Sequence, residues 1–109
     1  MKTYNGKYEH EKCIVYVWED GKNRRRLDNW RGESSAGFGW GHCGDEAQDL
    51  AYSLCVDVTL SRDEGERCYD AVLDEIVARL KPRSSWFANE DRIMRVIRNA
   101  YMQPATSRL

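Results

Sequence analysis

Apolar and polar residues follow two periods along the chain, an alternation in the first third and a helical spacing after it. The β-branched and aromatic run over residues 13–18 predicts a strand, and the Asp20-Gly21 pair after it is a strong signal for a hairpin turn. The return strand is expected over residues 24–30, where alternation divides the side chains between two faces. One face carries Arg25, Leu27 and Asn29, and the other arginines lie opposite.

Two shorter segments complete the predicted sheet. Residues 38–40 are expected to form a third strand, and residues 2–4 to join the sheet at an edge. Residues 31–36, which contain Gly and Ser, form the loop before the third strand. The pattern therefore predicts a small antiparallel sheet of three to four strands.

Three helices are predicted from their capping residues and apolar stripes. Asp45 begins the first, because its side chain can accept from the amide near Gln48 and Gln48 can reach back. Ser61 begins the second through a Ser-x-x-Glu cap, Lys81-Pro82 stops it, and Asn89 caps the third. The residues expected to be buried are Ala47, Leu50, Ala51, Leu54, Cys55 and Val58 on the first helix, Tyr69, Val72, Leu73, Ile76 and Leu80 on the second, and Ile93, Val96, Ile97, Ala100 and Tyr101 on the third.

These elements predict an α+β fold, a sheet packed by three helices in a single domain over residues 1–104, with residues 105–109 fraying. A chain of 109 residues with 41% apolar residues can bury a core without a metal or a disulfide. The N-terminus has no apolar leader, and no apolar run approaches the roughly 18 residues of a membrane span. We therefore expect a cytoplasmic protein outside the membrane, with its four cysteines reduced.

Charge is segregated along the chain although the net charge is only -1. Residues 44–78 carry ten acidic and two basic side chains, whereas residues 79–109 carry two acidic and seven basic ones. Packing between oppositely charged helices produces such a distribution, and the same distribution can present a field of one sign to a partner. Both interpretations stay open at this point.

The most informative motif is the stretch from Gly37 to Asp45, in which four glycines and two large aromatics precede the first predicted helix. Such a density of glycine indicates a tight turn or a close approach of the backbone. Together with Leu50-Ala51-x-x-Leu54 and Trp86, the motif resembles an uncharacterised family of small bacterial and phage proteins, whose signature is Gly-Phe-x-Trp-Gly-Tyr-Gly-Gly-Ser-Gly-Pro. The resemblance covers residues 4–100. It departs at His42, Cys43, Asp45 and Glu46-Ala47, where the family has Tyr, Gly, Ser and Gly-Pro.

The resemblance implies the predicted fold and a mobile-element context, and it names no reaction. We therefore expect a non-catalytic protein that inhibits a bacterial defence complex of the CRISPR–Cas type by docking on it, in the manner of anti-CRISPR proteins. An acidic strip would block a positively charged nucleic-acid channel, or the arginines would dock on an acidic subunit. The candidate partner-binding residues are Asp45, Glu46, Asp49, Asp63, Glu66, Asp70 and Asp74, together with Arg24, Arg25, Arg26 and Trp30.

Direct nucleic-acid binding is the first alternative. Residues 24–26 are three arginines on the hairpin, near Tyr16, Trp18 and Trp30, and cations interleaved with aromatic rings are used on single strands. The sequence pI of about 6.1 argues against this function, because nucleic-acid-binding domains commonly exceed about 9. An edge strand protected by arginines explains the triplet without any ligand.

A thiol-dependent enzyme that uses Cys43 and His42 is the second alternative, since an imidazole can act as the base for a thiol at a helix N-terminus. Adjacent residues of an extended segment point in opposite directions, however, so this pair is weak support. His10, His42 and the cysteines offer no ligand pair at the spacing of a zinc site. We expect no enzyme activity, no cofactor and no metal.

Overall fold

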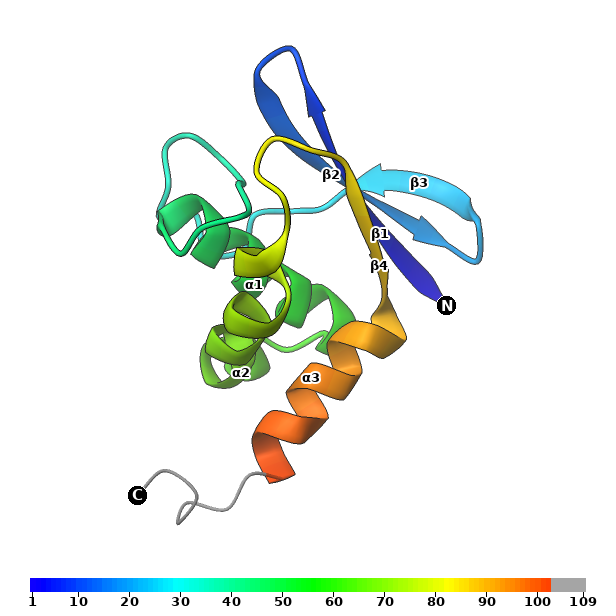
Figure 1. Ribbon diagram of the computed structural model, residues 1–109. Coiled ribbons are helices and arrows are strands. Elements are labelled where there is room, and N and C mark those ends of the chain that lie inside the picture. The colour runs from blue at the N-terminus through cyan, green and yellow to red at the C-terminus, as the bar shows by residue number, and fades with distance from the viewer. Residues whose placement is uncertain (103–109) are drawn as a thin grey trace.

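The computed structural model describes residues 1–102 and contains one antiparallel sheet and three α-helices (Figure 1). The strands are β1 (Lys2–Glu9), β2 (Lys12–Glu19), β3 (Lys22–Arg26) and β4 (Trp86–Asn89). The helices are α1 (Asp45–Thr59), α2 (Arg62–Glu75) and α3 (Glu90–Met102), and a 3-10 turn over Val77–Arg79 follows α2. The predicted α+β fold is confirmed. The predicted domain limit at residue 104 and the tail over residues 105–109 lie outside the described residues.

The strand order β3-β2-β1-β4 places β1 in the interior of the sheet. Residues 2–4 were expected at an edge, and this is wrong because β4 pairs with β1 on the side away from β2. The hairpin between β1 and β2 turns at His10 and Glu11, whose φ angles of 51° and 63° are left-handed. Such turns usually contain Asn, Asp or Gly, so the sequence carries no turn signal here.

The predicted return strand is too long at its end. β3 stops at Arg26, and the chain leaves the sheet after the amide of Leu27 donates to the carbonyl oxygen of Val15 at 2.9 Å. Asn29 and Trp30 therefore belong to the loop between β3 and α1.

Residues 38–40 do not form a strand. Gly37 and Gly41 have φ angles of 86° and 82°, which an L side chain rarely adopts, so the chain bends on both sides of the segment. The amide of Gly39 donates to the carbonyl of Glu46, and that of Gly41 to the carbonyl of Val77. The segment is thus bonded to the start of α1 and to the turn after α2, in place of the sheet.

Two tryptophans attach this loop and β4 to the core. Trp40 is 2% exposed and its indole donates to the carbonyl of Ser84, while Trp86 packs edge-to-face against it at 5.6 Å between ring centres. Trp86 also covers Gly6 so closely that a Cβ at position 6 would lie 2.0 Å from the Trp86 Nε1 atom. While position 86 is a tryptophan, position 6 therefore requires glycine.

Two of the three predicted helix caps are confirmed. The Ser61 hydroxyl accepts from the amide of Glu64, and the Asn89 side chain accepts from the amide of Arg92. The cap predicted for α1 is wrong by one residue, because Gly44 is the N-cap and Asp45 is the first helical residue. The apolar stripes are largely confirmed, but Tyr101 is 51% exposed and α2 ends before Lys81-Pro82, at Glu75.

Candidate functional site on the outer face of the sheet

The three α-helices lie on one side of the sheet, as Figure 1 shows, and the alternation of the strands divides their side chains accordingly. Tyr4, Val15, Val17 and Ala88 point into the core and are at most 3% exposed. Their neighbours form the other side, which we call the outer face. It consists of Thr3, Asn5 and Lys7 of β1, Ile14, Tyr16 and Trp18 of β2, Arg24 and Arg26 of β3, and Phe87 and Asn89 of β4. Glu9 and Lys12 lie on the same side of the sheet at the tip of the β1–β2 hairpin, and we do not count them with the outer face.

Three aromatic rings project from the outer face. Phe87 is 72% exposed, and Tyr16 and Trp18 are half-buried by their neighbours. The Arg24 guanidinium lies 4.4 Å from the centre of the Tyr16 ring and 5.9 Å from that of Trp18. Such a cation over a ring contributes about 0.5–1 kcal/mol at an exposed site, which holds the group together loosely.

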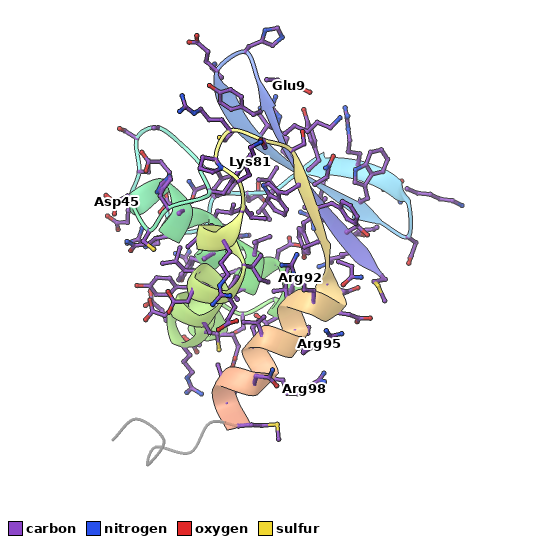
Figure 2. The ribbon with its side chains drawn as sticks, in the orientation of Figure 1. Glu9, Asp45, Lys81, Arg92, Arg95 and Arg98 are labelled. Carbon is purple, nitrogen blue, oxygen red and sulfur yellow. The ribbon has the colours of Figure 1, made fainter. Side chains whose placement is uncertain are left out.

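The charge of the outer face is entirely positive. Lys7, Arg24 and Arg26 are its ionised residues, and none of the ten outer-face residues is a carboxylate. Glu9 is a carboxylate on the same side of the sheet. It lies at the tip of the β1–β2 hairpin, directly opposite Lys12 (Figure 2). The rings and the cations therefore share a surface without a neutralising partner of their own.

Arg25 differs from the two arginines beside it in sequence. Its side chain points to the helices, where it donates to both carboxylate oxygens of Asp57 at 2.8 and 3.1 Å. The Tyr4 hydroxyl donates to the same carboxylate at 2.6 Å, and burial together with this bond raises the pKa of Tyr4. The Lys2 ammonium lies 3.5 Å from it. Arg25 thus joins β3 to α1, whereas Arg24 and Arg26 face solvent.

Asp49 was expected in an exposed acidic strip, and this is wrong because its side chain is fully buried. Arg31 donates to it at 2.9 Å, Asn29 at 3.1 Å, and the amides of Ser34 and Glu33 at 3.0 and 3.2 Å. Burial alone would raise the pKa of Asp49, but these hydrogen bonds outweigh it and hold the pKa below its ordinary value. The carboxylate fastens the loop after β3 to α1.

The other predicted acidic residues divide into two places. Asp63, Glu66, Asp70 and Asp74 are exposed along α2, at the spacing that puts them on one side of a helix. Asp45 is exposed and Glu46 half-buried at the start of α1, so they do not extend that row. Between α2 and α3 runs a groove of about 410 Å³, lined by Ala71, Asp74, Glu75, Val96, Asn99 and Ala100.

The remaining predicted basic and aromatic residues lie away from the outer face. Trp30 is 39% exposed in the loop after β3, where the Arg62 guanidinium lies 5.9 Å from its ring centre. Arg92, Arg95 and Arg98 are exposed on α3, as Figure 2 shows. The structure therefore does not bring the helical arginines to the arginines of β3.

The two residues of the thiol alternative are both exposed at the bend before α1. The Nδ1 atom of His42 accepts from the amide of Gly44 at 3.0 Å, and the carbonyl of Cys43 accepts from the Gln48 side chain. Within residues 1–102, no hydrogen bond joins the imidazole to the thiol. A thiol-dependent reaction at this pair stays a prediction.

Sequence reasoning missed Asn5, Lys7 and Phe87 as members of this surface. β1 contains no apolar run, and β4 has only four residues, so neither gives a strong strand signal. The alternation Tyr4-x-Gly6-x-Tyr8 was the available signal for β1. Within residues 1–102, no helix is both long and apolar enough to cross a membrane.

Comparison with known proteins gives a family and no activity. No curated protein and no solved structure matches the chain. The family model DUF6166, described as a family of unknown function, matches residues 4–99. This range agrees closely with the span of the resemblance seen in the glycine and tryptophan motif. The chain therefore belongs to DUF6166, a family of unknown function.

Proposed function

We propose that the outer face binds a single strand of nucleic acid, with unpaired bases stacked on its rings and phosphates beside its cations. The observation that supports this function is the presence of Tyr16, Trp18 and Phe87 with Arg24 and Arg26 on one uncovered sheet face. Proteins that bind single strands combine a positive surface with aromatic rings, and each stacked base contributes about 1–3 kcal/mol.

The spacing of the rings suits several bases. Tyr16 and Phe87 lie in one row across the sheet with Asn5 between them, so their strands are two spacings of about 4.8 Å apart. Trp18 stands two residues further along β2, at about 7 Å from Tyr16. Rings at such separations on an antiparallel sheet can each hold one base, and two or three bases are commonly held in this way.

An unpaired strand fits this surface better than a duplex. In a duplex each base is covered by its neighbours, so rings that stand on a sheet have no base face to contact. The outer face offers only three cations, Lys7, Arg24 and Arg26, so about three phosphates are neutralised. The logarithm of the binding constant should then fall with the logarithm of salt concentration with a slope of about -2.

The net charge of -1 does not oppose this function, because it is the sum over the whole chain and a row of acidic residues lies on a helix away from this face. The carboxylates of Asp63, Glu66, Asp70 and Asp74 lie along α2, whereas the outer face is free of them. A nucleic-acid strand is therefore repelled by the helix and attracted by the sheet, which fixes the side from which it approaches.

Fluorescence anisotropy with labelled single strands of about 12 nucleotides, DNA and RNA, and with the matching duplex tests this proposal. We expect the single strands to bind more tightly than the duplex. Tyr16→Ala and Phe87→Ala should each weaken single-strand binding about tenfold. Tyr101→Ala is the matched control, because Tyr101 is also an exposed ring but lies on α3.

A second pair of variants separates the local cations from the overall charge. Arg24→Ala should weaken binding severalfold and reduce the salt slope by about 0.7, whereas Arg95→Ala, which removes the same charge from α3, should change neither. Equal losses in the two variants, or no binding of any single strand at low salt, would contradict the proposal.

A second candidate function is docking on a bacterial defence complex of the CRISPR–Cas type, as expected for a mobile-element protein. The specific observation in its favour is the exposed row Asp63, Glu66, Asp70 and Asp74 on α2, since carboxylates in a row can occupy a channel built for phosphates. A purified effector complex should lose target-DNA binding when the protein is added, and Asp70→Lys with Asp74→Lys should restore it. Glu9→Lys, at the hairpin tip, is the matched charge reversal and should leave inhibition intact.

A further inference from the structure

A groove runs between α2 and α3, in the helical layer that lies on the other side of the sheet from the outer face (Figure 1). Tyr101, at the end of α3, donates to Glu64, near the start of α2, whereas Glu75 at the end of α2 shares the groove with Val96 of α3. The two helices therefore lie antiparallel along the groove. Its volume of about 410 Å³ falls within the range of ligand sites, which is roughly 300–1,000 Å³.

The groove has an apolar floor and a negatively charged rim. Two alanines, one on each helix, line it, and their short side chains leave room between the helices. A ligand that enters the groove therefore meets aliphatic groups below it and carboxylates along the edge of α2. The half-buried lining residues are Ala71, Val96 and Ala100, and the exposed ones are Asp74, Glu75 and Asn99.

The carboxylates of this rim have no cation of the protein beside them. In the part of the chain that the structure describes, no salt bridge includes Asp74 or Glu75. Arg79 lies close to Asp74, but its guanidinium donates to the main-chain carbonyl of that residue at 3.0 Å. None of the described residues that line the groove here is basic. The rim therefore keeps its negative charge for a ligand.

We propose that this part of the groove binds an arginine or lysine side chain from a basic segment of a partner protein. The methylene groups of such a side chain can lie on the floor while its charged end reaches Asp74 and Glu75. An acidic segment or a phosphate would be repelled by the same two carboxylates. Binding in the groove is independent of the proposed nucleic-acid function, because the outer face lies on the opposite side of the sheet and stays open to a strand.

The groove continues beyond this site, which favours a segment with more than one basic residue. An adjoining space of about 340 Å³ shares Ala71, Asp74 and Ala100 with the first and adds Asp70 and Tyr101. A single ion pair at an exposed site contributes little to affinity, so several cations along the groove are needed for stable binding. The partner's cations thus enter a groove of this protein, whereas in the second candidate function the acidic row of α2 enters a channel of the partner.

Fluorescence anisotropy with a labelled peptide of four arginines separated by alanines tests this proposal, and the same peptide with citrulline in place of arginine is its neutral counterpart. We expect the arginine peptide to bind about tenfold more tightly than the citrulline peptide. Asp74→Asn with Glu75→Gln should weaken arginine-peptide binding about tenfold. Asp63→Asn with Glu66→Gln, which removes the same charge from α2 outside the groove, should weaken it less than about twofold, because more distant exposed charges are screened.

A further variant blocks the groove without changing its charge. Ala100→Leu should weaken arginine-peptide binding severalfold, because the larger side chain fills part of the floor. Ala36→Leu, the same exchange at an exposed position of the loop after β3, should leave binding unchanged. Circular dichroism should show the wild-type helix content for each variant.

Equal binding of the two peptides, equal losses in the two charge variants, or full binding by Ala100→Leu would overturn binding in the groove. Single-strand binding should change by less than about twofold in these variants, because they lie on the other side of the sheet from the outer face. Phe87→Ala should weaken single-strand binding and leave arginine-peptide binding unchanged. The two sites can therefore fail separately.

Discussion

On the inner face of the sheet the side chains meet the helices, and on the outer face the same strands present theirs to solvent. Tyr4 and Val17 are fully buried, whereas Phe87 is 72% exposed. Arg25, on the inner face, is paired with Asp57, while within residues 1–102 no carboxylate pairs with Arg24 or Arg26. Packing and pairing account for the inner residues. The rings and cations of the outer face are neither packed in the core nor paired with carboxylates, which is why we propose that they bind a ligand.

The largest expected effect comes from two neighbouring residues of β4, of which one lies on each face. Trp86→Ala should lower the free energy of unfolding by about 3–5 kcal/mol, because it empties a site in the core. Phe87→Ala should change it by less than about 0.5 kcal/mol, since that ring is mostly in solvent. Urea unfolding followed by tryptophan fluorescence and by circular dichroism measures both. Similar losses would remove the distinction between the faces.

The arginines of β3 give the next largest difference. Arg25→Ala should cost about 1–3 kcal/mol, because it leaves the carboxylate of Asp57, which is 7% exposed, without its guanidinium. Arg24→Ala should cost less than about 1 kcal/mol of stability, the value of an exposed cation–π contact. Thermal unfolding and strand binding, measured on the same two variants, should show opposite orders: Arg25 matters more to stability and Arg24 more to binding. The same order in both measurements would contradict this division.

A smaller effect separates the buried carboxylate from the exposed ones. The pKa of Asp49 is lowered in the folded protein from its ordinary value of 3.8, so the unfolded chain takes up this proton at a higher pH than the folded chain does. The stabilisation is therefore complete above that value and is lost as the pH falls through the lower folded pKa. Asp49→Asn should remove this part of the acid sensitivity and, at neutral pH, cost about 1–3 kcal/mol because its amide group faces donors.

Asp70→Asn is the control for this measurement, since Asp70 is exposed on α2. Its unfolding curve between pH 7 and pH 3 should follow that of the wild type within about 0.5 kcal/mol. A curve for Asp49→Asn that keeps the full wild-type loss in acid would show that another group is responsible.

The parts of the fold that the sequence predicts well are those set by local chemistry. The turn at Asp20-Gly21, the caps at Ser61 and Asn89 and the inward position of Arg25 all follow from neighbouring residues. Each depends on a hydrogen bond or an alternation within a few positions. Such signals can be recognised in the sequence without knowledge of the tertiary contacts.

The parts that failed depend on residues far apart in the sequence. β4 exists because its four residues pair with β1, 80 to 86 positions earlier, and nothing local marks them as a strand. Asp49 looks like one more surface carboxylate until the loop over residues 29–34 folds onto it. The outer face could not be anticipated as a unit for the same reason, since Phe87 joins Tyr16 only through the register of β1.

The contact between Gly6 and Trp86 restricts which sequences this architecture accepts. Because a Cβ at position 6 would overlap the indole, a larger residue there is compatible only with a smaller ring or an aliphatic side chain at position 86. In a combinatorial library at the two positions, folded variants with a larger residue at position 6 should therefore carry a smaller residue at position 86. A larger residue at position 6 alone, or a smaller one at position 86 alone, should destabilise the fold. Two positions that never touch a ligand would then vary together.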